Sequence, residues 1–260
     1  MNYFVAYNTD IGIRKKTNED SIAVKILDTP KGRAVLAIVC DGMGGLSAGE
    51  LASKEVVLAY GQWFDTSFAK MAAAGEFDLN VITNEWRSLA VAENSKLGVY
   101  GSNHNAGLGT TLSALLLYRE QYLIIQVGDS RIYEMTTEGI RQVTEDQSVV
   151  AREIAAGRLT PEEALRDPRR SILLQCIGAS ASVEPVFYQG TVMPETSYLL
   201  CSDGFCHEIS HRELLEQLGP QACKNPTVMR QNCTYLTDLV KQRKEQDNIS
   251  VILVKYPAAS

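Results

Sequence analysis

Val35-Leu36-Ala37-Ile38-Val39-Cys40 is an uninterrupted apolar run, and it leads directly into Asp41-Gly42-Met43-Gly44-Gly45. An apolar run of this length that ends in glycines predicts a strand buried on both faces. Asp41 follows the run at once, so we expect its carboxylate to lie at the end of that strand. Gly42 has no side chain, so its backbone carbonyl can approach the same ligand as Asp41.

Acidic residues recur at the ends of other apolar runs. Tyr198–Ser202 leads into Asp203-Gly204, and Asp247-Asn248 directly precedes the predicted strand Ile249–Lys255. A single Asp-Gly pair is most often an ordinary turn, but this pattern repeats in strand context. If the strand ends converge, up to six carboxylates meet in one place, namely Glu19, Asp20, Asp41, Asp129, Asp203 and Asp247.

Such a cluster requires cations, because several carboxylates a few ångströms apart cannot all be ionised alone. Hard oxygen ligands select Mg²⁺ or Mn²⁺. The cysteines and histidines of the chain show no zinc-ligand spacing. The sequence therefore predicts a Mg²⁺ or Mn²⁺ site built from carboxylates.

The order of the predicted elements indicates an α+β fold with mainly antiparallel sheet, because the long helices fall in two blocks separated by consecutive strands. The predicted strands are Tyr3–Tyr7, Ser21–Leu27, Val35–Cys40, Thr111–Tyr118, Tyr122–Val127, Arg131–Met135, Val183–Tyr188, Tyr198–Cys201 and Ile249–Lys255. The predicted helices are 48–64, 79–100, 147–156, 161–165, 211–218 and 227–243. We expect one domain over residues 1–260, in which a polar segment at about 144–180 forms an inserted flap.

Composition excludes several functional classes. The 260 residues carry a net charge of -6, so no global positive field attracts nucleic acid or anionic lipid. The apolar runs are shorter than the roughly 20 residues that span a bilayer. Met1–Asp10 also lacks the basic and apolar segments of a secretory signal. We expect a cytoplasmic monomer that binds neither membrane nor nucleic acid.

The motifs together resemble those of the metal-dependent serine/threonine protein phosphatases of the PPM, or type 2C, family. In order they are Asn18-Glu19-Asp20, Asp41-Gly42-Met43-Gly44-Gly45, Gly109-Thr110-Thr111, Gly128-Asp129-Ser130, Ser202-Asp203-Gly204 and Asp247-Asn248. The resemblance spans nearly the whole chain, and the stretch from Thr144 to Arg170 is similar to the flap of the bacterial branch. It implies a central β-sandwich flanked by helix pairs, in α-β-β-α layers, with a two-metal centre at one end.

Residue by residue, the resemblance implies that Asp41 bridges both metals and that Gly42 offers its carbonyl. Asp203 and Asp247 would complete the ligand set of one ion, and Glu19 and Asp20 would bind the metals directly or through waters. Asp129 matches the aspartate of a third, looser metal site. His207 stands where relatives often carry an acid that helps to hold that third metal.

The residue expected to bind the substrate phosphate departs from the family pattern. Relatives have an arginine three residues before the asparagine of Asn18-Glu19-Asp20, whereas this chain has Lys15, with Arg14 beside it. Lysine offers a point charge where arginine offers a bidentate fork. Two alignments stay open: Lys15 binds the phosphate, or Arg14 does so after a one-residue slip.

The resemblance implies a phosphatase that hydrolyses phosphoserine and phosphothreonine in proteins with a metal-activated water and no covalent intermediate. Its partners would be phosphorylated proteins, including a serine/threonine kinase and its targets. Two rivals stay open. One is a non-catalytic domain that acts as a scaffold or inhibitor of a kinase, and the other is a metal-dependent phosphodiesterase or nuclease. The presence of Asp41, Asp203 and Asp247 argues against a non-catalytic domain, and the net negative charge argues against a phosphodiesterase or nuclease.

Overall fold

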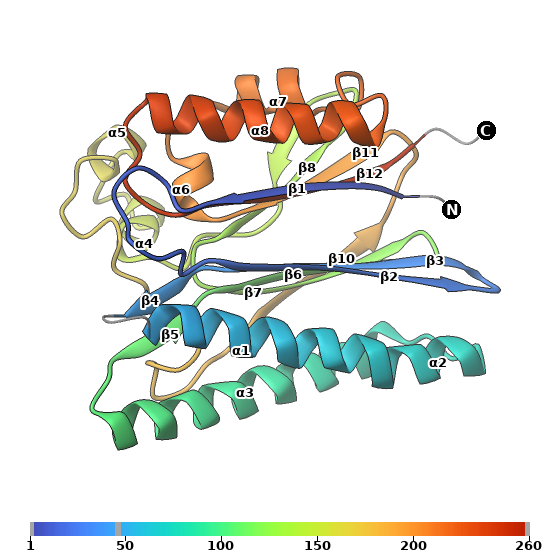
Figure 1. The fold of residues 1–260 in the computed structure, drawn as a ribbon, viewed down its shortest axis with the longest axis horizontal. Coiled ribbons are helices and arrows are strands. Elements are labelled where there is room, and N and C mark those ends of the chain that lie inside the picture. The colour runs from blue at the N-terminus through green and yellow to red at the C-terminus, as the bar shows by residue number, and fades with distance from the viewer. Residues whose placement is uncertain (1–2, 45–47, 258–260) are drawn as a thin grey trace.

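Two five-stranded antiparallel sheets lie face to face in the computed structural model, which describes residues 3–44 and 48–257. Helices cover the outer face of each sheet, so the layers follow the order α-β-β-α (Figure 1). This arrangement confirms the predicted α+β fold with a central antiparallel sandwich. No helix in the described ranges is both long and apolar enough to cross a membrane.

The first sheet joins the two ends of the chain. Its strand order is β1-β12-β11-β8-β9, and every neighbouring pair is antiparallel. The strands are β1 (Phe4–Asp10), β8 (Arg131–Met135), β9 (Ile140–Gln142), β11 (Thr196–Cys201) and β12 (Ile249–Tyr256). Because β1 pairs with β12, Asp10 lies opposite Ile249, and the loop that follows β1 is close to Asp247 and Asn248.

The second sheet contains the strand that ends at Asp41. Its order is β10-β7-β6-β3-β2, again antiparallel throughout. The strands are β2 (Ser21–Thr29), β3 (Gly32–Cys40), β6 (Leu112–Tyr118), β7 (Gln121–Val127) and β10 (Val186–Thr191). A short separate pair, β4 (Gly42–Gly44) with β5 (Leu108–Thr110), extends beyond the end of β3.

Two groups of helices form the outer layers (Figure 1). The second sheet is covered by α1 (Ala48–Trp63), which runs through a π-helical segment (Phe64–Phe68) into α2 (Ala69–Ala74), and by α3 (Leu79–His104). The first sheet is covered by α7 (His211–Leu218) and α8 (Pro226–Gln242). Asn225 caps α8, and Ser210 caps α7 through a reciprocal capping box with Glu213.

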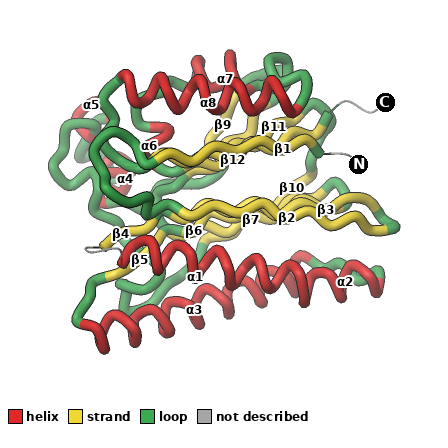
Figure 2. Tube along the Cα trace, viewed as in Figure 1, coloured by secondary structure: helices red, strands yellow, loops and turns green. Residues whose placement is uncertain are grey.

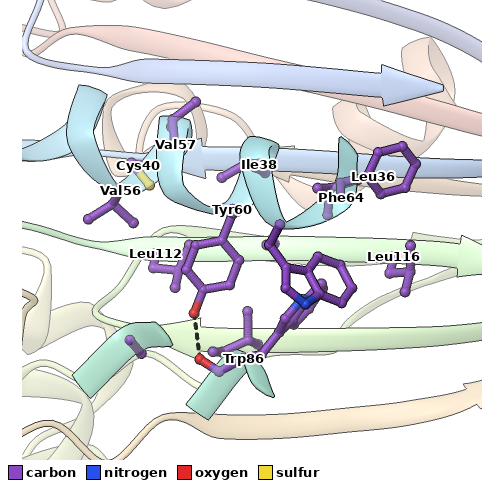
Figure 3. Close-up of a cluster of buried hydrophobic side chains, with 14 of the residues drawn as sticks. Leu36, Ile38, Cys40, Val56, Val57, Tyr60, Phe64, Trp86, Leu112 and Leu116 are labelled. Atoms are coloured by element: carbon purple, nitrogen blue, oxygen red, sulfur yellow. Dashed lines mark hydrogen bonds between the residues drawn. The ribbon is translucent and has the colours of Figure 1, made fainter. Parts of the chain in front are cut away.

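The position of β3 between two cores explains why Val35–Cys40 is apolar at every residue. Val35, Ala37 and Val39 face the interior of the sandwich, where they pack with residues of both sheets. Leu36, Ile38 and Cys40 face the helices, where the Tyr60 hydroxyl donates a 2.8 Å hydrogen bond to the Trp86 carbonyl (Figure 3). A strand between two cores is covered on both faces and has no polar face. The first polar side chain after Val35–Cys40 is therefore that of Asp41, where the strand ends.

Loops and short helices gather at one end of the sandwich (Figure 2). Segment 144–180 contains α4 (Val149–Ala155) and α5 (Pro161–Ala164) at this end, and α6 (Asp203–Cys206) lies nearby. Arg131 anchors the start of the segment through hydrogen bonds of 2.6 to 3.0 Å to Asp146. Thr110 and Ile177 anchor its return through two 2.9 Å backbone hydrogen bonds.

Most predicted elements occur with small shifts at their ends, and Arg131–Met135 and 211–218 agree at both ends. The additional elements are β4, β5, β9, α2, α6 and the π-helical segment. All are short or continue another element, so their local apolar periodicity is too weak to predict them.

Candidate metal centre

Five of the six predicted carboxylates converge on one cavity at the loop end of the sandwich. The cavity has a volume of about 200 Å³ and is also lined by Lys15. Its carboxylates come from the ends of strands in both sheets, and they are Glu19, Asp41, Asp129, Asp203 and Asp247. Asp20 lies behind the cavity wall and is 7% exposed. The convergence expected from strand ends is therefore what the fold produces.

Asp41 is held through its backbone by Thr111, the residue between β5 and β6. Its N–H donates to the Thr111 hydroxyl at 2.8 Å, and its carbonyl accepts the Thr111 N–H at 2.9 Å. Ser130 lies within hydrogen-bond distance of the same hydroxyl, at 2.7 Å. The motif Gly109-Thr110-Thr111 thus fixes the end of β3.

Gly42 occupies a backbone cradle that admits no side chain. A Cβ at this position would overlap the carbonyl oxygen of Gly49 and lie 2.5 Å from the carbonyl oxygen of Glu19. The Gly42 N–H donates to that Glu19 carbonyl at 3.1 Å. Glycine at 42 is therefore required for the approach of α1 to the segment that carries Glu19.

Two carboxylate oxygens beside the cavity are buried and have no hydrogen-bond partner among the described residues, Oδ1 of Asp20 and Oδ1 of Asp203. The other oxygen of Asp20 accepts a 2.9 Å hydrogen bond from Ser202. Burial raises the pKa of Asp20 to about 7, and the charges of Asp203 and Asp247 add to the increase. An unpaired buried carboxylate is costly, so these oxygens are suited to bind a cation.

The same electrostatics act on Asp41 and Asp129. Burial raises the pKa of Asp41 well above its usual value, and the charges of Asp20 and Asp203 raise it further. Burial also raises the pKa of Asp129, with Asp203 as the largest contributing charge. Asp203 therefore acts on every buried carboxylate of the cluster.

His207 lies at the edge of the cluster rather than in the carboxylate cavity. Its Nδ1 is 3.9 Å from Oδ2 of Asp203 and 4.0 Å from Oε2 of Glu245. It lines a neighbouring cavity of about 350 Å³ beneath α4 and α5, and Asp129 lines both cavities. The residues predicted for a third metal thus lie around two neighbouring cavities, on the side of segment 144–180.

Lys15 and Arg14 occupy different places. Nζ of Lys15 is 2.6 Å from Oδ1 of Asp247, on the wall of the carboxylate cavity. Arg14 instead donates a hydrogen bond to the side chain of Gln246 in an adjoining hollow. Of the two candidates for binding the substrate phosphate, Lys15 is therefore the one beside the predicted metal ligands.

Asn248 is a positioning residue that sequence reasoning did not identify. Its side-chain oxygen accepts the Glu19 N–H at 2.8 Å, and its amide donates to the carbonyls of Ile11 and Thr17 at 2.9 and 3.1 Å. It thus joins the loop after β1 to the loop before β12. The only sequence signal was its place directly after Asp247.

The donor set fits divalent cations. Carboxylate oxygens and the Gly42 carbonyl are hard ligands of the kind that Mg²⁺ and Mn²⁺ prefer. Two of the oxygens are buried and unpartnered. In the described ranges, however, no three His, Cys, Asp or Glu side chains are placed so that they could hold one ion as they stand. The carboxylates surround the cavity, and the Lys15 ammonium balances part of their charge.

Comparisons with known proteins agree with this site. The model of the protein phosphatase 2C family matches residues 13–241. A putative protein phosphatase 2C-type of Streptococcus pyogenes is 31% identical over 252 residues, covering 96% of each chain. Serine/threonine phosphatase stp of Listeria monocytogenes is 30% identical over 253 residues, covering 96% of this chain and 94% of its own.

Solved structures show the same similarity. The serine/threonine phosphatase of S. agalactiae superposes with a TM-score of 0.83 at 28% identity, covering 98% of this chain and 99% of that chain. The catalytic domain of the phosphatase PstP, solved in complex with 2 manganese ions, gives a TM-score of 0.78 at 27% identity and covers 98% of this chain and 99% of its own. With the family model, the relatives and the carboxylate cavity in agreement, this chain belongs to the protein phosphatase 2C family.

Proposed function

We propose that this protein hydrolyses phosphoserine and phosphothreonine in phosphoproteins at the carboxylate cavity, with two divalent cations and no covalent intermediate. It is a serine/threonine protein phosphatase by family, and the proposal concerns how the reaction is performed. The observation that carries it is the convergence of five carboxylates on one cavity. The manganese ions in the PstP structure agree with this use of the cavity.

We carry the ligand assignment over from the family motifs, and five of its carboxylates line the cavity. Asp41, the Gly42 carbonyl, Asp203 and Asp247 would hold the two central ions, with Glu19 and Asp20 binding directly or through waters. Asp129, Asp203 and His207 would hold a looser third ion. Bound Mn²⁺ or Mg²⁺ supplies positive charge and lowers the pKa of a water molecule.

The other residues position and balance these groups. Thr111 fixes the end of β3, and Asn248 fixes the loop that carries Glu19. Lys15 would bind a phosphate oxygen, since its ammonium is a point charge at the cavity wall. No nucleophilic side chain is required, because phosphoryl transfer depends mainly on positioning and charge.

We also propose that residues 1–260 form one catalytic domain, with segment 144–180 as a flap, and that the protein acts as a monomer. Phosphoprotein substrates follow from the family. A serine/threonine kinase and its targets are the proposed partners.

The test compares p-nitrophenyl phosphate with its diester, bis(p-nitrophenyl) phosphate, in Mn²⁺, in Mg²⁺ and in chelator. We expect metal-dependent hydrolysis of the monoester and little reaction with the diester. Asp41→Asn should lower kcat by several orders of magnitude, whereas Asp65→Asn, on an exposed side chain outside the cavity, should not change it. Turnover after complete chelation would refute the metal mechanism, and preference for the diester would favour the phosphodiesterase reading.

A further inference from the structure

A second hollow adjoins the carboxylate cavity. Its volume is about 690 Å³, and it shares Lys15 and Asp247 with that cavity. Its walls come from four distant parts of the chain: the loop after β1, the segment near Arg170, the turn after α6 that carries Glu208, and the loop between α8 and β12. A substrate bound at the carboxylates therefore has this hollow directly beside it.

Two of the acids that line the hollow already have partners. Asp247 forms the 2.6 Å ion pair with Lys15. Glu245 is 8% exposed, and its Oε1 accepts the backbone N–H groups of Gln246 and Asp247 at 2.6 and 3.0 Å. Asp247 is therefore neutralised by Lys15, whereas Glu245 keeps its negative charge but is held by backbone donors rather than by a cation of the hollow.

Apart from the Lys15–Asp247 pair, three cations remain on the walls, Arg14, Arg170 and Lys244, against the two carboxylates of Glu208 and Glu245. None of the three forms an ion pair with a carboxylate in the part of the chain that the structure describes. Arg14 donates to the neutral side chain of Gln246, and Arg170 donates to a backbone carbonyl, that of Leu165, at 3.4 Å. The hollow thus has four cations against three carboxylates, an excess of one positive charge in a protein whose net charge is -6.

We propose that this hollow is a second anion subsite, which binds an acidic group of the phosphoprotein near the phosphoresidue being hydrolysed. The shared chemistry is a negatively charged oxygen group, supplied either by a second phosphate or by an Asp or Glu side chain of the substrate. Arginine forks and a lysine ammonium bind both kinds of group. The inference rests on the proposed function, because it places the first phosphate at the carboxylate cavity.

The backbone conformation at Lys244 permits a substitution that removes the side-chain charge without straining the backbone. Lys244 has φ +73°, a left-handed conformation that asparagine and glycine adopt more easily than lysine. Lys244→Asn therefore removes the charge without straining the fold. Lys224→Gln is the matched control, since Lys224 is also exposed but precedes α8, at the opposite end of that helix.

The experiment measures phosphate release in Mn²⁺ from three peptides: one phosphothreonine among alanines, the same with glutamates on either side, and the same with a second phosphothreonine nearby. We expect the acidic peptides to have a kcat/KM about 5 to 20-fold higher, mainly through a lower KM, as one or two charge-assisted contacts provide. Lys244→Asn and Arg170→Gln should each remove most of this preference. Lys224→Gln should keep it, and p-nitrophenyl phosphate should be hydrolysed at the same rate by all variants.

Each outcome is decisive. A gain only for the doubly phosphorylated peptide identifies the subsite as one for phosphate, and an equal gain for glutamates identifies it as one for any acidic group. Equal kcat/KM for all peptides, or a preference that survives both variants, overturns the subsite while leaving the phosphatase proposal intact. Failure to hydrolyse any peptide or p-nitrophenyl phosphate would instead refute the proposed function.

Discussion

Asp203→Asn should stabilise the metal-free protein and destabilise the metal-loaded protein relative to wild type. In wild type, Oδ1 of Asp203 is buried without a hydrogen-bond partner among the described residues, as is Oδ1 of Asp20. The charge of Asp203 also raises the pKa values of Asp20, Asp41 and Asp129, after the effect of burial. Asparagine keeps the shape of the side chain and removes that charge.

The size of the effect follows from these contacts. Relieving one unpartnered buried carboxylate should return about 1–3 kcal/mol to the chelated protein. A change of 1 kcal/mol moves the Tm of a protein of this size by about 2–4 °C, so the variant should melt about 2–12 °C higher in chelator. Metal at 100 times its Kd stabilises wild type by about 2.7 kcal/mol per site. The variant loses a shared ligand and with it most of this gain.

Differential scanning calorimetry in chelator and then in Mn²⁺ measures both effects. Asp65→Asn is the control: it removes an ion pair with Lys25 outside the cavity, so any small change in its Tm should be the same in both buffers. The expected signature is a crossover, in which the variant melts above wild type in chelator and below it in Mn²⁺. If Mn²⁺ raises the two Tm values equally, Asp203 is not a metal ligand.

The other predictions concern separate parts of the structure. Gly42→Ala should lower the free energy of unfolding by at least about 1–3 kcal/mol in urea titrations even in chelator, because the added Cβ would overlap backbone atoms. An unchanged urea midpoint would show that this position has room for a side chain. Lys15→Ala should tighten Mn²⁺ binding up to about fivefold by calorimetry, since it removes a partly exposed ion pair worth about 0.2–1 kcal/mol, and weaker binding would show that Lys15 does not compete for Asp247. Tyr60→Phe should cost about 1 kcal/mol of stability and leave kcat unchanged, because its hydroxyl bonds only the Trp86 carbonyl among the described residues, away from the cavity. The hydrogen bond from Arg243 is the largest cause that lowers the pKa of Glu213 to about 2, so the ionised carboxylate stabilises the fold fully above pH 4.5 and this stabilisation is lost as the pH falls toward 2. The difference in unfolding free energy between wild type and Glu213→Gln should therefore vanish over that range. A difference that persists at pH 2 would exclude this ionisation as its cause.

Local sequence determined the larger elements. β3 could be predicted because burial between two cores makes each of its residues apolar, and the long helices could be predicted because one face of each packs on a sheet. The antiparallel class followed from the order of these elements alone. Asp41 and Asp203 could be selected because each lies just beyond the end of a strand that is buried along most or all of its length.

Only the tertiary structure decided what these residues meet. The side chain of Asn248 joins segments 229 residues apart, and the ion pair of Lys15 with Asp247 spans a similar separation. The hollow lined by Arg14, Arg170 and Lys244 likewise combines three remote loops. Sequence periodicity reports the environment of a residue within its own helix or strand, whereas these contacts depend on how the two sheets pack and which strand ends meet, so no local pattern encodes them.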